Sequence, residues 1–373
     1  MRVRRRRAGA EPPSGGTATP TATPTSGGTG ERSAGDGTGT GALVEVTDLA
    51  VRFGADVDAL RGVSFSLQPG ETLAVVVTGL PRTGTTLLHN LLALDPGSRS
   101  LRLWEALRPV PPRPEEGLSE DELVRRAAAW LDRLYEVVPG FRSIHPATAE
   151  GPEECDALLQ NDFASQHFDD MFDGEAYSEW LATAPLREQY RSYARQLNVL
   201  RRSEDEGKPW VLKSPSHLGH LDALLETCPD ATIVHCHRDP AEAVPSYASL
   251  VHCLRRAYSD AVSTTAVGRQ AVGRCATAVA RALDVRRRAP DRFVDVAYAD
   301  LARQPLATVG RLYEQLGRRL RPEVQAAMQG FLARHPQHEH GVHRYTPDDF
   351  ALSRPVIASA FTRYLEECSP SIG

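Results

Sequence analysis

The sequence predicts an α/β protein whose core is a parallel sheet. Short apolar runs that are typical of buried strands stand at residues 75–78, 210–212 and 232–237. Segments with helical periodicity lie around them, at residues 86–94, 119–137, 185–202 and 220–228. Strands that alternate with helices pair in parallel through crossover connections. In such a sheet ligands bind beyond the carboxyl ends of the strands, so the residues after each run are the first candidates for a site.

Composition and charge narrow the class of protein. Of the 373 residues, 41% are apolar and 24% are charged, which is typical of a globular chain with one large α/β domain or two average ones. The net charge is -5, but arginines at positions 2 and 4–7 hide part of the imbalance. Without these five, 38 of the 43 basic residues remain against 48 acidic ones, or -10. Because the chain after residue 7 is this acidic, we expect it to bind nucleic acid poorly.

Several features of the sequence indicate the cytoplasm. The six cysteines form no C-x-x-C pair, which favours free thiols in a reducing compartment. The arginine-rich start has no apolar stretch behind it, so we do not expect a secretory signal. No run approaches the ~20 apolar residues of a membrane span. The oligomeric state is left open.

Three parts follow one another along the chain. Residues 1–42 are almost entirely Gly, Ser, Thr, Ala and Pro after the arginines, a composition that predicts a disordered tail. Residues 43–74 hold two runs of alternating apolar and polar residues, at 43–54 and 59–67, which predict a short antiparallel β segment. Residues 75–373 carry the helix and strand alternation and form the main domain.

The β segment resembles the amino-terminal strands of ABC-transporter ATPases. The stretches Leu60-Arg61-Gly62-Val63-Ser64-Phe65 and Pro69-Gly70-Glu71 carry this resemblance, which ends at about residue 76. The chain has no Gly-Lys-Ser after its loop, no Leu-Ser-Gly-Gly signature and no apolar run that ends in Asp-Glu. The ATPase itself is therefore not expected.

The loop after the first buried strand is built to hold an anion. It has the phosphate-loop spacing Gly79-x-x-x-x-Gly84, but Thr85 stands where the lysine of a nucleotide-binding loop is expected. Backbone N–H groups of residues 82–86 at the start of a helix bind phosphate or sulfate oxygens, and Arg82 adds a charged contact. A structural turn between strand and helix is the alternative. Without the lysine, the loop is poorly suited to the γ-phosphate of ATP.

Two further candidates follow the other buried strands. Lys213 ends one strand in Leu212-Lys213-Ser214-Pro215-Ser216-His217, where its side chain is expected in the ligand crevice. Arg238-Asp239-Pro240 follows the next strand, and Ser246 comes eight residues after Arg238. Pro240 suits the first turn of a helix, which puts Arg238 at its mouth and Ser246 about two turns in. Each residue alone also has a purely structural explanation. Lys213 can be a lysine at the edge of the sheet, Arg238 can pair with Asp239 on the surface, and Ser246 can be an ordinary serine within a helix.

In this order, the three pieces resemble the PAPS-dependent sulfotransferases, most closely the bacterial branch, over about residues 75–365. The resemblance implies a three-layer parallel sheet with P-loop NTPase-like sulfotransferase topology. It also implies PAPS (3′-phosphoadenosine 5′-phosphosulfate) as co-substrate, with no metal. Its 5′-phosphosulfate is expected on Arg82, Thr83, Gly84, Thr85 and Thr86. Its 3′-phosphate is expected on Arg238 and Ser246, with Arg344 of His343-Arg344-Tyr345 as a further contact.

The resemblance also implies the catalytic residues and the reaction. Lys213 and His217 are expected beside the reacting sulfuryl group, and Glu105 of Trp104-Glu105 near the acceptor hydroxyl as the base that takes its proton. A sulfuryl group carries less charge than a γ-phosphoryl group, so cationic side chains and backbone donors suffice. The acceptor is a hydroxyl of a small molecule, carbohydrate or lipid. A P-loop kinase or NTPase and a non-catalytic fusion protein are the alternative functions.

Other clusters have simpler interpretations. Four histidines, at 335, 338, 340 and 343, and the run His235-Cys236-His237 are spaced like metal ligands, but we expect no metal at either. The acidic run Glu150, Glu153, Glu154 and Asp156 reads as a solvated N-terminal turn of a helix. Aromatic and methionine side chains between residues 163 and 180 are expected to pack in the core rather than to line an acceptor pocket: Phe163, Phe168, Met171, Phe172, Tyr177 and Trp180.

Overall fold

The computed structural model describes residues 44–53, 57–67, 74–110, 112, 116–336 and 345–372. The predicted tail 1–42 and the predicted contact Arg344 lie outside these residues. The β segment holds two strands, β1 (Val44–Phe53) and β2 (Val57–Leu67), which pair in antiparallel register from Val44 opposite Leu67 to Phe53 opposite Val57. The prediction of antiparallel strands in this segment is therefore confirmed.

The main domain is built on a five-stranded sheet in which every neighbouring pair is parallel. Its order is β4-β5-β3-β6-β7. The strands are β3 (Ala74–Gly79), β4 (Arg99–Ser100), β5 (Trp210–Lys213), β6 (Thr232–His237) and β7 (Phe293–Ala297). The three predicted strands are confirmed as β3, β5 and β6, which form the centre of the sheet. The two edge strands were not predicted.

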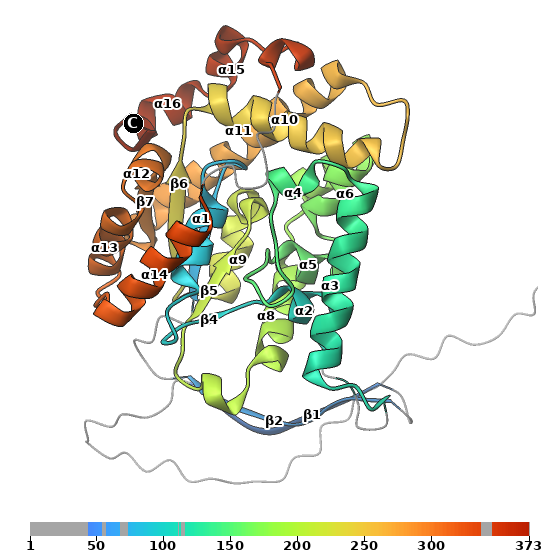
Figure 1. Ribbon diagram of the computed structural model, residues 1–373, viewed down its shortest axis with the longest axis vertical. Helices are drawn as coiled ribbons and strands as arrows, with labels where there is room; N and C mark the ends of the chain where they lie inside the picture. The colour runs from blue at the N-terminus through green and yellow to red at the C-terminus, as the bar shows by residue number, and fades with distance from the viewer. Residues whose placement is uncertain are drawn as a thin grey trace, which may run out of the picture. The chain divides into compact units, whose positions relative to one another are not determined.

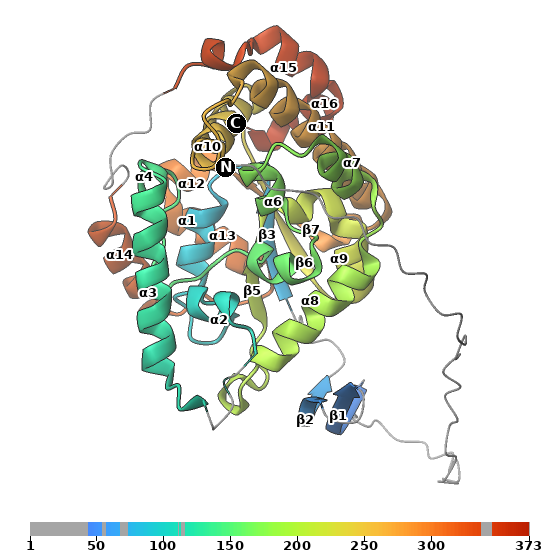
Figure 2. The same ribbon diagram turned by 90° about the vertical axis from the view of Figure 1, so that its right-hand side faces the viewer.

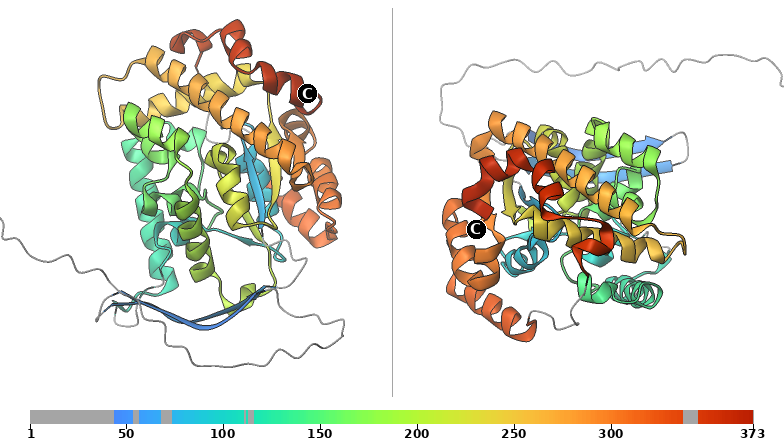
Figure 3. Two further views of the ribbon diagram at one scale, coloured as in Figure 1. Left: turned by 180° about the vertical axis from the view of Figure 1, so that it is seen from behind. Right: turned by 90° about the horizontal axis from the view of Figure 1, so that it is seen from above.

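Helices cover both faces of the sheet, so the domain has three layers. On one face Val75 and Val77 of β3 pack against α1 (Thr85–Leu92), α13 (Pro305–Gln315) and α14 (Pro322–Arg334). On the other face Ala74 and Val76 join a larger core with α8 (Arg187–Leu200), α9 (Leu221–Thr227), α10 (Pro240–Arg256) and α11 (Thr264–Arg288). Figures 1 and 3 show these two helical layers, with α13 and α14 in orange-red and α8 and α9 in green. Alternation along β3 sends successive side chains into the two cores.

The predicted helices form close to their expected bounds. In α3 (Glu120–Val137) the Ser119 hydroxyl accepts a hydrogen bond from the amide of Glu122 at 3.2 Å, as the N-cap pattern predicts. The periodic face of α8, which includes Tyr190, Tyr193 and Leu197, is buried. The sequence did not predict the shorter helices α2 (Leu103–Leu107), α4 (Phe141–Ile144), α5 (Asp156–Leu159), α6 (Gln166–Met171), α7 (Glu175–Thr183), α12 (Tyr298–Arg303), α15 (Arg354–Ala360) and α16 (Thr362–Ile372).

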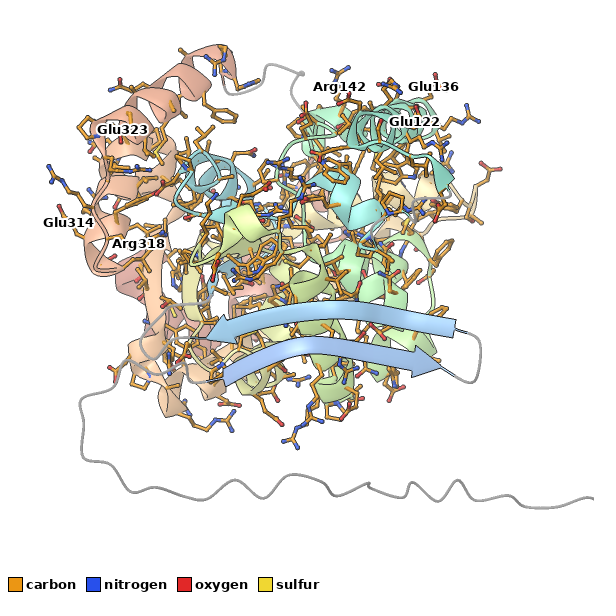
Figure 4. All side chains as sticks on the ribbon, turned by 90° about the horizontal axis from the view of Figure 1, so that it is seen from below. Glu122, Glu136, Arg142, Glu314, Arg318 and Glu323 are labelled. Atoms are coloured by element: carbon orange, nitrogen blue, oxygen red, sulfur yellow. The ribbon has the colours of Figure 1, made fainter. Side chains whose placement is uncertain are left out.

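Charged side chains mark the outer surface of the helical layers. Figure 4 shows Glu122, Glu136 and Arg142 on α3 and α4 at one side, and Glu314, Arg318 and Glu323 around α13 and α14 at the other. Among the described residues, no helix combines the length and the apolar character that crossing a bilayer requires.

The order of the strands creates a crevice at their carboxyl ends. β3 lies between β5 and β6, so the chain leaves β3 at the point where the connections turn to opposite sides. Figure 2 shows α4, α6 and α10 gathered at this end of β3. The segments after β3, β5 and β6 therefore meet there, and they carry most of the predicted site residues.

Candidate active site

The loop from Gly79 to Gly84 has a backbone that favours glycine at both ends. Gly79 has φ 155°, and a Cβ there would lie 2.3 Å from the carbonyl oxygen of Cys236. Gly84 has φ 85° and occupies the N-cap position of α1, so no side-chain oxygen covers the first amide groups of that helix. The Thr83 hydroxyl donates to the carbonyl of Leu80 at 2.7 Å and closes the turn. The loop therefore leaves its N–H donors available to an anion.

Arg82 connects this loop to two helices. Its φ is 71°, an uncommon conformation for a residue with a side chain. Its Nε donates to the Ser246 hydroxyl at 3.3 Å, and its Nη1 donates to the carbonyl of Ile144 at 2.8 Å. Burial lowers the pKa of Arg82 below its usual value, and the nearby Arg238 charge acts in the same direction. An anion at this position would relieve that unfavourable charge environment.

Arg238 lies beside the same loop. Its Nη1 donates to the carbonyl of Arg82 at 2.9 Å, and its guanidinium stands 4.3 Å from the centre of the Tyr298 ring. Its Nη2 also lies 3.1 Å from Oε2 of Glu242. As predicted, Pro240 stands in the first turn of α10, with Asp239 as N-cap, and Ser246 is buried further along that helix. The structure thus brings Arg82, Arg238 and Ser246 together.

Lys213 ends β5 and is almost completely buried, with 1% of its surface exposed. Its Nζ donates to the Thr86 hydroxyl at 3.3 Å and lies 2.5 Å from Oε1 of Glu154. Lys213 and the start of α1 therefore meet, as the positions of their strands predict. Glu154, the partner of Lys213, was not predicted as a site residue.

Glu154 belongs to the acidic run that was expected to be a solvated turn, and this prediction is wrong. Glu153 and Asp156 are buried, and only 15% of the Glu154 side chain is exposed. Asp156 accepts hydrogen bonds from the hydroxyls of Ser214 and Ser216, the latter at 2.8 Å, and so fixes the segment after Lys213. The run turns inward because lysine and hydroxyl donors at the sheet edge offer its carboxylates partners that offset their loss of hydration.

His167 of α6 completes this group. Its Nε2 lies 3.8 Å from Oε2 of Glu154. Burial opposes its charge, but the carboxylates of Glu154, Asp156 and Asp170 outweigh burial and raise the pKa of His167 to about 9. Burial likewise opposes the ionisation of Glu154, yet Lys213 and His167 hold its pKa well below its usual value. Near neutral pH the group is therefore a carboxylate between two cations.

His217 lies behind this group, in the core beside α8. Its Nδ1 is 2.8 Å from the Tyr190 hydroxyl, and its ring packs against the rings of Tyr190 and Tyr193. Burial lowers the pKa of His217 to about 4, so the imidazole is neutral near neutral pH. Its Nε2 has no hydrogen-bond partner among the described residues.

The structure does not bring Glu105 to the loop. Its Oε2 accepts the backbone N–H of Arg102 at 3.0 Å, which caps α2, and its Oε1 forms a buried ion pair with Arg99. Arg99 pairs with Trp210 at the start of β5, whereas Lys213 ends that strand. The two ends of the strand are separated by about 10 Å of backbone. Glu105 therefore acts here as the cap and counter-ion of a structural network.

The two histidine clusters lie in different parts of the chain. Cys236 is buried, and His235 and His237 are packed with ring centres 4.0 Å apart, as predicted. His237 is also 2.9 Å from Asp295, which pairs with Arg286. His335 is described, but the histidines at 338, 340 and 343 lie outside the described residues.

The chain is similar to several known proteins. Residues 74–322 match the sequence model of the sulfotransferase family. The chain belongs to the sulfotransferase family. The match covers the sheet, the loop, Lys213, Arg238 and Ser246. The predicted resemblance and fold are therefore confirmed.

Two solved structures of sulfotransferases resemble this member of the family. STF9 from Mycobacterium avium has a TM-score of 0.68 and 31% identity, over 79% of this chain and 76% of that one. STF1 from Mycobacterium tuberculosis has a TM-score of 0.67 and 31% identity, over 78% and 76%.

The curated relatives match over shorter stretches. The omega-hydroxy-beta-dihydromenaquinone-9 sulfotransferase Stf3 of Mycobacterium tuberculosis is 26% identical over 262 residues, which are 65% of this chain and 62% of the relative. The chain thus spans less than two thirds of that protein. The oligopeptide transport ATP-binding protein OppD of Bacillus subtilis is 30% identical over 131 residues, about a third of each chain.

Proposed function

We propose that this chain transfers a sulfuryl group from PAPS to the hydroxyl of a small-molecule acceptor. The observation that carries the proposal is the convergence of Arg82, Lys213, Arg238 and Ser246 at one edge of the sheet. These residues come from three separate strand ends and supply three cations and a hydroxyl to one crevice. Membership of the sulfotransferase family supports assigning that crevice to a sulfated nucleotide.

The donor set fits the two charged ends of PAPS. The uncapped start of α1 and the Arg82 guanidinium suit the 5′-phosphosulfate, because both offer several N–H donors to tetrahedral oxygens. Arg238 and Ser246 suit the 3′-phosphate. The 3.3 Å hydrogen bond from Arg82 to Ser246 means that the two subsites adjoin, as they must for one nucleotide to fill both.

In the proposed reaction the acceptor oxygen attacks sulfur as the bond from sulfur to the bridging phosphate oxygen breaks. The electron pair of that bond leaves with the 5′-phosphate of adenosine 3′,5′-bisphosphate, and the Lys213 ammonium stabilises the developing charge. We assign Glu154, rather than Glu105, to take the acceptor proton. Its carboxylate lies 2.5 Å from Lys213, so base and cation act on the same reacting group.

The ion pair between Lys213 and Glu154 makes proton transfer depend on the presence of the donor. While Lys213 contacts Glu154, the carboxylate is a weak base because its pKa is held low. A donor oxygen that competes for Lys213 loosens the pair and raises the basicity of Glu154. Proton transfer is then favoured only when the donor is in place.

The acceptor class is proposed more coarsely. The name of one relative states that it acts on omega-hydroxy-beta-dihydromenaquinone-9, a lipid with a terminal hydroxyl. That relative is only 26% identical, so we extend to this chain no more than an alcohol on a small organic molecule.

Ligand-induced thermal stabilisation tests the proposal. Adenosine 3′,5′-bisphosphate should raise the melting temperature of the full chain, whereas ATP with magnesium should not. Arg238→Gln should raise the apparent Kd for adenosine 3′,5′-bisphosphate by about 10- to 100-fold, because it removes a charge-assisted contact. Arg354→Gln is the matched control, because that arginine is exposed and bonds only Asp239 among the residues described here.

The same experiment separates the alternatives. Stabilisation by ATP with magnesium alone would favour a kinase or NTPase and overturn the proposal. Stabilisation by neither nucleotide would also overturn it and favour a non-catalytic protein. Transfer of label from ³⁵S-PAPS to 2-naphthol, lost in Lys213→Ala, would establish the reaction itself.

A further inference from the structure

Some aromatic side chains that the sequence assigns to the core are exposed instead, among them Phe163, just before α6, and Trp180 of α7. The exposed fractions are 70% for Phe163 and 40% for Trp180. Phe163 stacks on Phe168 at 5.6 Å, Phe168 meets the edge of Tyr177 at 6.1 Å, and Tyr177 lies 5.6 Å from Trp180. We call these four rings the aromatic platform. Tyr177 packs against the main core, but burial does not account for the positions of Phe163 and Trp180.

The platform is held in place by its own backbone. The Tyr177 hydroxyl donates to the carbonyls of Phe163 and Ser165, at 2.8 and 2.9 Å. Phe163 has φ 55°, a left-handed conformation that costs a bulky residue about 1 kcal/mol or more. A strained backbone that presents a large apolar ring to solvent is expected at a ligand site rather than in a passive loop.

The platform is continuous with the candidate active site. His167, which precedes Phe168, contacts Glu154, and the Ser165 hydroxyl donates to Asp156 at 3.2 Å. A cavity of about 60 Å³ lies between the loop and this region, and its lining includes Pro81 beside Arg82, Ser216 after Lys213, Gln166 of α6 and Ser178 of α7. The segment that carries the platform therefore also bonds the acidic run beside Lys213.

The charge of this region limits the acceptor further. Residues 161–186 contain six carboxylates and neither lysine nor arginine. Asp169 and Asp170 are buried against Arg274, at 2.6 and 3.0 Å. Asp173 pairs with Arg255 at 3.0 Å, and the remaining three, Asp162 and the exposed Glu175 and Glu179, leave the surface around the platform negative. A negative rim repels anions and tolerates or attracts cations.

We propose that the aromatic platform binds the apolar part of the acceptor, and that this acceptor is an uncharged or cationic alcohol or phenol rather than an anion such as a glycan sulfate. The proposal rests on the proposed function, because it takes the Glu154 group as the place where the acceptor hydroxyl reacts.

Binding of three related phenols tests it. The full chain is saturated with adenosine 3′,5′-bisphosphate and titrated with 2-naphthol, 6-(aminomethyl)-2-naphthol and 6-hydroxy-2-naphthoate, which carry a neutral, a cationic and an anionic group at the same ring position. We expect the carboxylate to bind at least about tenfold more weakly than the other two. Trp180→Ala should weaken 2-naphthol about five- to tenfold, because it removes an aromatic contact.

Trp130→Ala is the matched control, since Trp130 lies on α3 with 47% of its surface exposed, and its affinity for 2-naphthol should be unchanged. Equal affinities for the three phenols, or equal affinities of Trp180→Ala and the unaltered chain, would overturn the proposal. So would a dimer that Trp180→Ala dissociates in sedimentation velocity, because the platform would then be an interface between copies. Binding that depends on Trp180 without transfer from PAPS would sustain the platform and overturn only the proposed function.

Discussion

Lys213 and Glu154 form a buried ion pair whose members come from distant parts of the chain. Each is stable in the interior only because the other is there, since an unpaired buried charge costs several kcal/mol. The pair therefore couples the stability of the site to its chemistry, and substitutions must be judged by both.

Glu154→Gln should lower kcat by about 10²- to 10⁴-fold, because the amide cannot take the acceptor proton. The KM for PAPS should change little, since Glu154 is assigned to the acceptor. Steady-state kinetics with ³⁵S-PAPS and 2-naphthol, corrected for the folded fraction, measure both constants.

Glu105→Gln is the control for this prediction. It breaks the buried pair with Arg99 and should lower the free energy of unfolding by about 3 kcal/mol, with kcat per folded molecule nearly unchanged. The assignment of the base to Glu154 fails if Glu105→Gln abolishes turnover in folded protein and Glu154→Gln does not.

Gly79→Ala should destabilise the fold by at least about 3 kcal/mol. The added methyl group meets the backbone oxygen of Cys236, and the φ of 155° is unfavourable for alanine. Gly273→Ala is the matched control, because that glycine is exposed in α11 with open space around it, and alanine there should be neutral or stabilising by about 1 kcal/mol. Urea unfolding measures both; equal effects would contradict the steric argument.

Residues of the site were predictable where position in the sheet determines them. Arg82, Lys213, Arg238 and Ser246 follow central strands, and the topology makes such ends converge. Glu154 was missed because a run of acidic residues is usually solvated, and its direction depends on a lysine about 60 residues away. Glu105, predicted near the acceptor hydroxyl, caps α2 in the structure, a role that its local sequence also suits.

At the level of elements, α8 supports the site from behind through Tyr190 and His217. Tyr190→Phe should cost about 1–3 kcal/mol of unfolding free energy, because it leaves the buried Nδ1 of His217 without its partner. Tyr258→Phe is the control. Because Tyr258 is 53% exposed, removing its hydroxyl should change the free energy of unfolding by no more than about 0.5 kcal/mol. Thermal and urea unfolding check this. A variant Tyr190→Phe of full stability but low kcat would instead give His217 a part in the chemistry.

The central elements could be predicted from the sequence and the edge elements could not. β3, β5 and β6 are apolar runs because both of their faces are buried. β4 has two residues, and β7 carries Asp295 in its middle, so neither shows that pattern. The aromatic residues of α6 and α7 were assigned to the core because hydrophobic spacing alone does not distinguish a core face from a ligand-binding face.

At the scale of the whole molecule, buried histidines make stability depend on pH. Burial, as the largest cause, lowers the pKa of His89 to about 3, those of His217 and His220 to about 4, and that of His235 well below its usual value. Each binds its proton near pH 6.5 in the unfolded chain, so between about pH 6.5 and 4 the unfolded state holds more protons and stability falls as pH falls. Burial raises the pKa of Asp170 to about 6, which opposes this by one proton.

The free energy of unfolding should therefore decrease by about 4 kcal/mol per pH unit near pH 5. Urea unfolding between pH 7.5 and about 5 measures the slope. His89→Gln, whose amide can still donate to the carbonyl of Val211, should reduce the slope by about one proton. A stability that stays constant across this range would contradict the burial of neutral histidines.

The pairing of the site cations with carboxylates of the same chain should also affect how the proposed donor nucleotide arrives from solution. Of the three site cations, Lys213 is matched by Glu154 and Arg238 by Glu242, and Arg82 alone has no carboxylate partner among the described residues, in a molecule that is acidic as a whole. Little positive potential then extends into the solvent, so electrostatic steering contributes little to encounter. In stopped-flow experiments the association rate of adenosine 3′,5′-bisphosphate should change less than about threefold between about 0.05 and 0.5 M salt. The protein then recognises the nucleotide only after the two are in contact. At that point the phosphate groups lose their hydration and replace Glu154 and Glu242 as partners of Lys213 and Arg238.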